Sequence, residues 1–256
     1  MCLLVLAWRA APGRRLVLVA NRDELHARPT APMHWWPEPA VLGGRDLSAG
    51  GTWLALDRRG RFGAITNFRG GPAPAAPPSR GTLIPRFLAG AEPPAVFLER
   101  LATEAAAYAG FSLLVGDGES LGYLCNRDAG GARLLSPGVY GLSNATLDAP
   151  WPKLVRSRAR FESLLAGAAD AEALLDVLAD RETAADAELP DTGVGLAVER
   201  RLSAPFIVDP VYGTRATSLV ELGEDGAGRA HERRFAPDGG LLGTTRVAVS
   251  GPDRLA

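Results

Sequence analysis

The sequence predicts one α+β domain over residues 1–256, folded as a four-layer αββα sandwich of two mainly antiparallel sheets. Three observations lead to this prediction. Strand-length apolar runs occur in pairs around short turns, which favours antiparallel hairpins. Helical patterns occur in two pairs, each placed between groups of strands. No repeat or linker divides the chain. A three-layer α+β arrangement is the second choice.

The N-terminal quarter is predicted to be hairpins. Apolar runs at 2–8 and 16–21 flank Pro12-Gly13, a strong turn signal. The segments GGTWLALD and RFGAITNF, within 50–68, predict a second hairpin. The Pro- and Gly-rich stretch at 70–81 predicts a loop.

Helices and strands then alternate along the chain. The segments TLIPRFLAG (82–90) and PPAVFLERLATEAAAYAG (93–110) predict helices, the second because its apolar residues recur every three or four positions. Strands follow over 111–126 and continue to residue 144. Further helices are predicted over 151–167 and 170–180, with Asp148 as a cap and Pro150 in the first turn. A strand over 211–222 and a last pair of strands complete the chain.

Composition excludes several classes of protein. The net charge of −1 lacks the basic excess of nucleic-acid-binding domains. Two distant cysteines, Cys2 and Cys125, form neither a disulfide framework nor a metal motif. The first apolar run is too short for a signal peptide, and no run reaches the roughly 18 residues of a membrane span. We therefore expect a cytoplasmic protein with no membrane span and no metal.

Cys2 is the first candidate for chemistry. Removal of Met1 would expose an α-amino group, which titrates near about 7.7–8.0, beside a thiol that titrates near about 8.5. One residue would then supply both a nucleophile and its base. The alternative is that Cys2 is one more apolar residue of a buried strand.

The segment ANRDEL (20–25) places polar residues at the end of an apolar strand. Strand alternation puts Asn21 and Asp23 on one face and Arg22 on the other. Asp23 is predicted to orient the Cys2 amine, and Arg22 to pair with a substrate carboxylate or with Asp23. The alternative is a solvated turn with a local ion pair.

Two asparagines also end strands. The side-chain amides of Asn67 and Asn144 are predicted to donate to a developing oxyanion, although asparagine also simply terminates strands. Arg215 begins a late strand and is either a site arginine or a surface charge. Trp35 and Trp36 form an aromatic cluster that either lines a ligand pocket or packs in the core.

Several of these segments together resemble the NRDE family, which includes the eukaryotic transport and Golgi organisation 2 proteins. The resemblance rests on the Cys2 start and, in order along nearly the whole chain, on ANRDE, GGTWLAL, GAITNF, YGLSNA, DAPWPK and YGTRATS. It implies a likeness to N-terminal nucleophile hydrolases of the choloylglycine hydrolase and penicillin V acylase branch, in which a processed N-terminal cysteine attacks an amide.

The resemblance carries over residue by residue. Asn21 and Asp23 match the branch's Arg-Asn-x-Asp motif, but its arginine position is Ala20, which leaves the role of Arg22 open. Asn67 matches an oxyanion-hole asparagine in the branch. Ser143-Asn144 matches its later Thr-Asn pair, and Arg215 matches a C-terminal site arginine more loosely.

Two functions follow as hypotheses. The first is a hydrolase of linear amides that needs no cofactor, with Cys2, Asp23, Asn67 and Asn144 catalytic and with Asn21, Arg22, Arg215, Trp35 and Trp36 binding the substrate. The second, implied by the family's association with haem trafficking and with lipid and acyl-CoA metabolism, is a carrier of non-covalent haem or an acyl ligand. Cys2 or His34 would then ligate the iron, or contact the haem without ligation. The acidic stretch 180–193 is either a lid or a loop.

Overall fold

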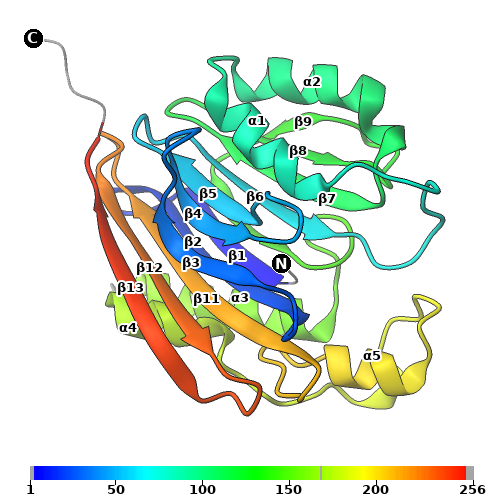
Figure 1. Cartoon of the computed structure of the whole chain (residues 1–256). Helices are drawn as coiled ribbons and strands as arrows, with labels where there is room; N and C mark the ends of the chain where they lie inside the picture. Colours follow the sequence, from blue (N-terminus) through cyan, green and yellow to red (C-terminus); the bar gives the residue numbers. More distant parts are fainter. Residues whose placement is uncertain (1–2, 168, 252–256) are drawn as a thin grey trace, which may run out of the picture.

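The computed structural model describes residues 3–167 and 169–251. Two antiparallel sheets pack face to face and carry helices on their outer faces, as predicted (Figure 1). The six-stranded sheet has the order β10-β1-β2-β11-β12-β13, and the seven-stranded sheet runs from β3 to β9 in chain order. None of the helices in this described part of the chain combines the length and apolarity that a membrane crossing requires.

The strands of the six-stranded sheet come from both ends of the chain and from its middle. Their bounds are β1 Leu3–Ala11, β2 Arg14–Leu25, β10 Gly138–Leu142, β11 Tyr212–Leu222, β12 Gly228–Phe235 and β13 Leu241–Val249. The seven-stranded sheet contains β3 Thr30–Trp35, β4 Val41–Asp46, β5 Leu54–Asp57, β6 Phe62–Asn67, β7 Phe111–Gly116, β8 Leu121–Cys125 and β9 Arg133–Leu135.

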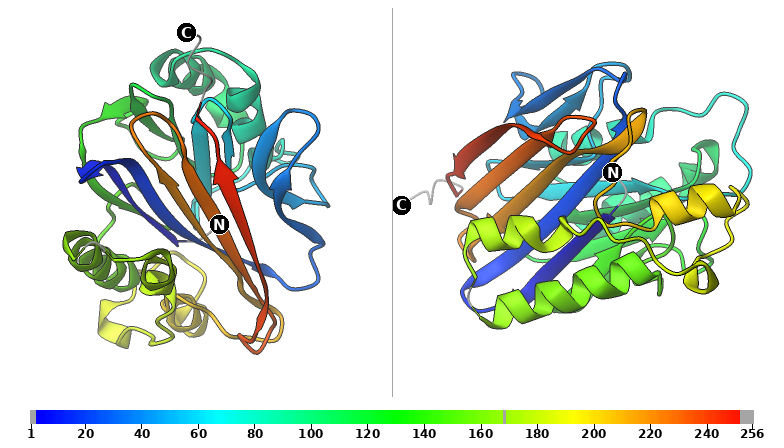
Figure 2. Two further views of the ribbon diagram at one scale, coloured as in Figure 1. Left: turned by 90° about the vertical axis from the view of Figure 1, so that its left-hand side faces the viewer. Right: turned by 90° about the horizontal axis from the view of Figure 1, so that it is seen from below.

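Three apolar clusters separate the four layers. Strand alternation sends Leu4, Leu6 and Trp8 of β1 into the core between the sheets, while Leu3 and Val5 face the helices. α3 (Pro152–Ala166) and α4 (Ala171–Leu175) cover the six-stranded sheet (Figure 2). α1 (Leu83–Ala89) and α2 (Pro94–Glu104) cover the other sheet, and α5 (Leu196–Leu202) precedes β11.

The predicted hairpins are confirmed. β1 and β2 are joined by Pro12-Gly13, where Gly13 adopts a φ of 67° that favours glycine. β5 pairs with β6, and β7 with β8. β3 and β4 are strands that the sequence did not predict, and within β3 Pro32 interrupts the alternation. An edge strand such as β3 tolerates proline because one side of its backbone makes no ladder bonds.

Two helix boundaries were predicted wrongly. α2 ends at Glu104 instead of continuing to Gly110, and the Asn126 side-chain amide donates to Ala105 O at 2.9 Å as the chain turns toward β7. Asp148 does not cap α3. It adopts a φ of 56°, and its carboxylate accepts a 2.7 Å hydrogen bond from the backbone N–H of Gly141 in β10. α3 begins with Pro152 at its first turn.

Candidate functional site

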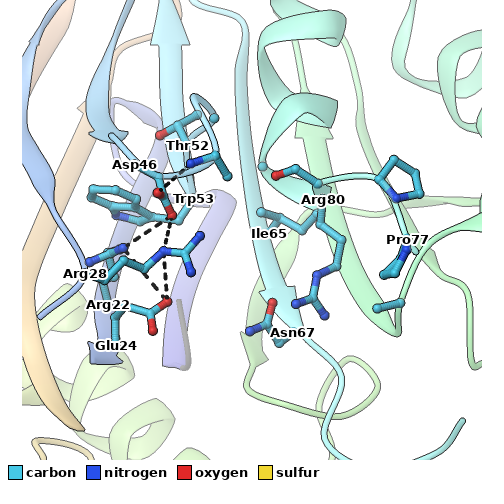
Figure 3. A pocket seen from close by; sticks show the side chains of 16 residues that line it. Arg22, Glu24, Arg28, Asp46, Thr52, Trp53, Ile65, Asn67, Pro77 and Arg80 are labelled. Carbon is cyan, nitrogen blue, oxygen red and sulfur yellow. Dashed lines mark hydrogen bonds and ion pairs between the residues drawn. The ribbon is translucent and has the colours of Figure 1, made fainter. Parts of the chain in front are cut away.

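A cavity of about 460 Å³ opens where β2, β4 and β6 end, beside the loop that precedes α1. Its size lies within the roughly 300–1,000 Å³ of small-molecule pockets. Arg22, Glu24 and Arg28 line one side and Asn67 and Arg80 the other, as Figure 3 shows. The remaining lining residues are Asp46, Ala49, Gly51, Thr52, Trp53, Ile65, Pro77, Pro78, Ser79, Gly81 and Ala109.

Arg22 is the buried cation of this cavity. Its side chain is 3% exposed and lies on the inter-sheet face of β2, with its guanidinium carbon 4.3 Å from the centre of the Trp53 ring. Its nearest carboxylates, Asp46 and Glu24, lie 3.8 and 4.0 Å from Nη2, beyond hydrogen-bond reach. Its Nη1 has no hydrogen-bond partner among the described residues. Burial lowers the pKa of Arg22.

Asp46 instead pairs with Arg28, whose Nε donates to its Oδ2 at 2.6 Å. Burial acts to raise the pKa of Asp46, but the hydrogen bonds from Arg28 and from the backbone N–H groups of Ser48 and Ala49 outweigh it. The pKa of Asp46 therefore lies below its usual value. Asp46 is committed to Arg28, so the charge of Arg22 is only weakly compensated.

The opposite wall depends on close backbone packing. Thr52 N donates to Gly81 O at 2.9 Å, which holds the loop before α1 against the start of β5. A Cβ at Gly51 would collide with the backbone of Gly81, so only glycine allows this approach. Arg80, beside Gly81, donates to Gly110 O at 2.7 Å. The cavity thus gains an arginine from a segment that the sequence identified only as a loop.

Asn67 is an exposed residue at the end of β6, and its position depends on Asn144. The Asn144 side-chain amide donates to Asn67 O at 3.0 Å, and Arg69 N donates to Asn144 O at 2.7 Å. Arg69 forms a 2.6 Å ion pair with the buried Glu199 of α5. The strand end that presents Asn67 to the cavity is therefore tied to α5.

Residues 1–237 match the family Transport and Golgi organisation 2. The chain belongs to this family. The human Transport and Golgi organization protein 2 homolog is 32% identical over 257 residues, which cover 88% of this chain and 90% of the human protein. The mouse homolog is 30% identical over 248 residues, with the same shares covered. The resemblance found in the sequence is confirmed.

Among solved structures, this member of the Transport and Golgi organisation 2 family is similar to a mutant conjugated bile acid hydrolase from Clostridium perfringens. The TM-score is 0.53 at 9% identity, and the match covers 99% of this chain and 95% of that chain. At this identity the likeness shows the fold alone. It confirms the predicted four-layer αββα fold.

The structure of this family member brings only part of the predicted site together. Arg22 and Asn67 line the cavity. Asn21 lies on the other face of β2, where its amide donates to Leu178 O and Pro205 O, both at 2.9 Å. Cys2 lies outside the described residues.

Asp23 and Arg215 lie at the same end of β2 but outside the cavity lining. Asp23 is buried, and its Oδ1 accepts a 2.6 Å hydrogen bond from Thr214 Oγ1. Arg215 occupies a bulge of β11, and its Nη1 donates to Leu25 O and Arg28 O at 3.0 and 2.7 Å. Arg215 thereby holds the segment that carries Arg28.

The two predicted tryptophans lie apart from the cavity and pack in different layers. Trp36 is buried beneath α1 and α2 and donates from Nε1 to Gly43 O at 2.9 Å. Trp35 packs at the edge of the inter-sheet core beneath Arg58. His34 is exposed, and one of its ring nitrogens lies 2.7 Å from Pro32 O. Across residues 3–167 and 169–251, no cluster of three or more His, Cys, Asp or Glu side chains is placed to hold a metal.

Sequence reasoning missed most of the cavity-lining residues. The missed residues come from a turn, a strand end, a loop and the 3₁₀ helix before α1, and they meet only in the folded chain. They are Arg28, Asp46, Trp53 and Arg80. The sequence offered a signal only for Trp53, which lies within the GGTWLAL segment.

Proposed function

We propose that this protein hydrolyses a linear amide whose substrate carries a carboxylate, with Cys2 as the nucleophile after removal of Met1. The observation that carries the proposal is the buried, weakly paired Arg22 in a cavity that also presents the Asn67 amide. The first described residue, Leu3, begins β1 and pairs with Asn21, the neighbour of Arg22. Cys2 is bonded to Leu3 in the chain.

In the proposed reaction, the Cys2 sulfur attacks the amide carbonyl carbon and its proton passes to the Cys2 α-amine. The Asn67 amide donates a hydrogen bond to the resulting oxyanion, as oxyanion-hole side chains do. The C–N bond then breaks, and the α-ammonium returns the proton to the leaving amine. Water attacks the acyl-thioester, releasing the acid and restoring the thiol. Asp23 orients the α-amine, and Arg22 binds the substrate carboxylate.

Three observations support this proposal. The fold is shared with a conjugated bile acid hydrolase, although at 9% identity this likeness extends to the fold alone. The cavity size suits a small molecule. Asn144 and Arg69 hold the backbone of the strand end that carries Asn67, and oxyanion stabilisation depends on preorganised donors.

The test begins with the intact mass of tag-free protein, followed by a screen of amides that carry a distal carboxylate. We expect Met1 to be absent, turnover to be lost in Cys2→Ala, and Cys2→Ser to bind substrate normally while turning over slowly. Active protein that retains Met1 would contradict the mechanism, as would unchanged turnover in Cys2→Ala.

A non-covalent carrier of haem or an acyl ligand, without turnover, is the second proposal. It is supported by the three cavity arginines, Arg22, Arg28 and Arg80, because haem propionates and fatty acids both present carboxylates. The described cavity lining contains no histidine, cysteine or methionine, so these residues would contact haem without ligating its iron. A haem titration that shows no saturable Soret change would exclude haem as the carried ligand.

A further inference from the structure

A second, smaller chamber shares Arg22 and Trp53 with the main cavity. β3, β11, β12 and β13 contribute its remaining walls, and its volume is about 110 Å³. One water needs about 10–15 Å³ by the same measure, so the chamber accommodates a small polyatomic group. We call it the anion chamber and define it by its four charged residues, Arg22, Arg215, Glu232 and Arg234.

Two guanidinium nitrogens of the anion chamber lack partners. Arg22 Nη1 and Arg234 Nε are buried and find no hydrogen-bond acceptor among the described residues. The nearest carboxylate oxygen to Arg234 Nε is Glu232 Oε1, at 4.0 Å. A buried guanidinium N–H without an acceptor is costly, so these donors favour a ligand that brings acceptor oxygens.

Glu232 only partly neutralises the positive charges of the three arginines in the anion chamber. Its Oε1 accepts a 2.8 Å hydrogen bond from Met33 N, which joins β3 to β12 across the two sheets. Burial raises the pKa of Glu232, which weakens its anionic form further. Three guanidinium groups against one carboxyl group leave an excess of two positive charges in the lining. A phosphate monoester carries about −1.5 to −2 at neutral pH and matches that excess.

The apolar residues of the anion chamber indicate what accompanies the phosphate. Phe235 and Leu242 line it beside the arginines, and Leu242 is largely exposed at the surface. A guanidinium group can donate two parallel hydrogen bonds to the oxygens of one phosphate. Phe235 and Leu242 offer only apolar contacts. We propose that the anion chamber binds the phosphate group of a small phosphomonoester, with Phe235 and Leu242 against its organic part. This site shares Arg22 with the main cavity, where the proposed hydrolysis uses it to bind a substrate carboxylate, but it does not require the Cys2 nucleophile.

The experiment is calorimetric titration of the full chain with inorganic phosphate and with phenyl phosphate, at constant ionic strength. We expect saturable binding of both, with phenyl phosphate tighter. Arg234→Gln should weaken phenyl phosphate binding at least tenfold, or about 1.4 kcal/mol. Arg234→Lys, which keeps the charge but loses the fork, should weaken it less. The matched control is Arg160→Gln on the exposed face of α3, which should bind as the wild type does.

The outcomes separate the possible sources of the anion. Equal affinity for both probes would overturn the monoester and leave a site for free phosphate. Absence of saturable binding, or equal weakening of binding in Arg160→Gln and Arg234→Gln, would show that the anion chamber is not a phosphate-binding site. Near-ultraviolet circular dichroism verifies folding, and Arg234→Lys carries the test if Arg234→Gln does not fold. Cys2→Ala should bind phenyl phosphate normally, so failure of the proposed hydrolysis would not remove this site.

Discussion

The two faces of β2 at its polar end use buried polar groups in opposite ways. On the helix-facing side, Asn21 donates to two carbonyl oxygens and accepts a 2.6 Å hydrogen bond from Thr217 Oγ1. On the inter-sheet side, the adjacent Arg22 reaches no hydrogen-bond acceptor with its Nη1 and lines two cavities. Both side chains are almost completely buried.

This contrast separates buried polar residues that hold the fold together from buried polar residues that are available to bind a ligand. A buried polar group that is fully hydrogen-bonded connects layers of the fold, as Asn21 connects β2 to the segments that contain Leu178 and Pro205. A buried cation that lacks acceptors costs stability, and such costs concentrate where ligands bind. Strand alternation places Asn21 and Arg22 on opposite faces, but it does not show which of the two side chains finds hydrogen-bond partners.

The largest expected effect is on the helix-facing side. Asn21→Ala leaves Leu178 O, Pro205 O and Thr217 Oγ1 without their partner, and each buried orphan costs about 1–3 kcal/mol. We expect the free energy of unfolding to fall by about 4 kcal/mol, measured by urea denaturation. An unchanged midpoint would show that Asn21 is not the structural member of the pair.

On the cavity side, Asn67→Ala should affect activity instead of stability. Asn67 is exposed, so the free energy of unfolding should change by less than about 0.5 kcal/mol. Under the proposed mechanism, kcat should fall about 10²–10³-fold through loss of an oxyanion donor. An equal loss of stability and activity would assign Asn67 a structural role.

Arg22→Met should leave the free energy of unfolding unchanged or raise it, whereas Asn21→Ala should lower it. Replacing a buried and poorly compensated charge by an apolar side chain of similar length is often neutral or stabilising by about 1 kcal/mol or more. We therefore expect unfolding at equal or higher urea concentration, together with loss of binding of carboxylate-bearing amides. Arg22→Lys is the control that keeps the charge. Destabilisation by Arg22→Met comparable to that of Asn21→Ala would erase the distinction between the two faces.

The smallest expected effect is the pH dependence of stability that comes from Asp46, the carboxylate nearest Arg22. The folded-state pKa of Asp46 lies below its unfolded value, so its ionised form stabilises the fold above the unfolded pKa of about 3.9. This contribution is lost as the pH falls through the folded pKa. Asp46→Asn should lower stability by about 1 kcal/mol at pH 7 and match the wild type in strongly acidic solution. If the difference in the free energy of unfolding between Asp46→Asn and the wild type did not change with pH, the lowered pKa of Asp46 would be contradicted.

Much of the architecture was predictable because its signals are local. Pro12-Gly13, the alternation through ANRDEL and the helical spacing at 93–104 each express a backbone preference over a few residues. The errors also have local causes. The position of Asp148 before a helix is typical of a cap. Its carboxylate instead accepts a hydrogen bond from the backbone N–H of Gly141 in β10, and no nearby sequence signal predicts this contact.

The sequence by itself determined the family, the pairing of strands into hairpins and the opposite orientation of Asn21 and Arg22, since these follow from motifs and from the two-residue period of a strand. Only the tertiary structure decided which polar residues share a cavity. Arg22, Arg80 and Asn67 meet because two sheets stack and Gly51 admits the loop at Gly81. Such contacts depend on the relative placement of distant segments, which side-chain packing across the whole core determines and no short stretch encodes.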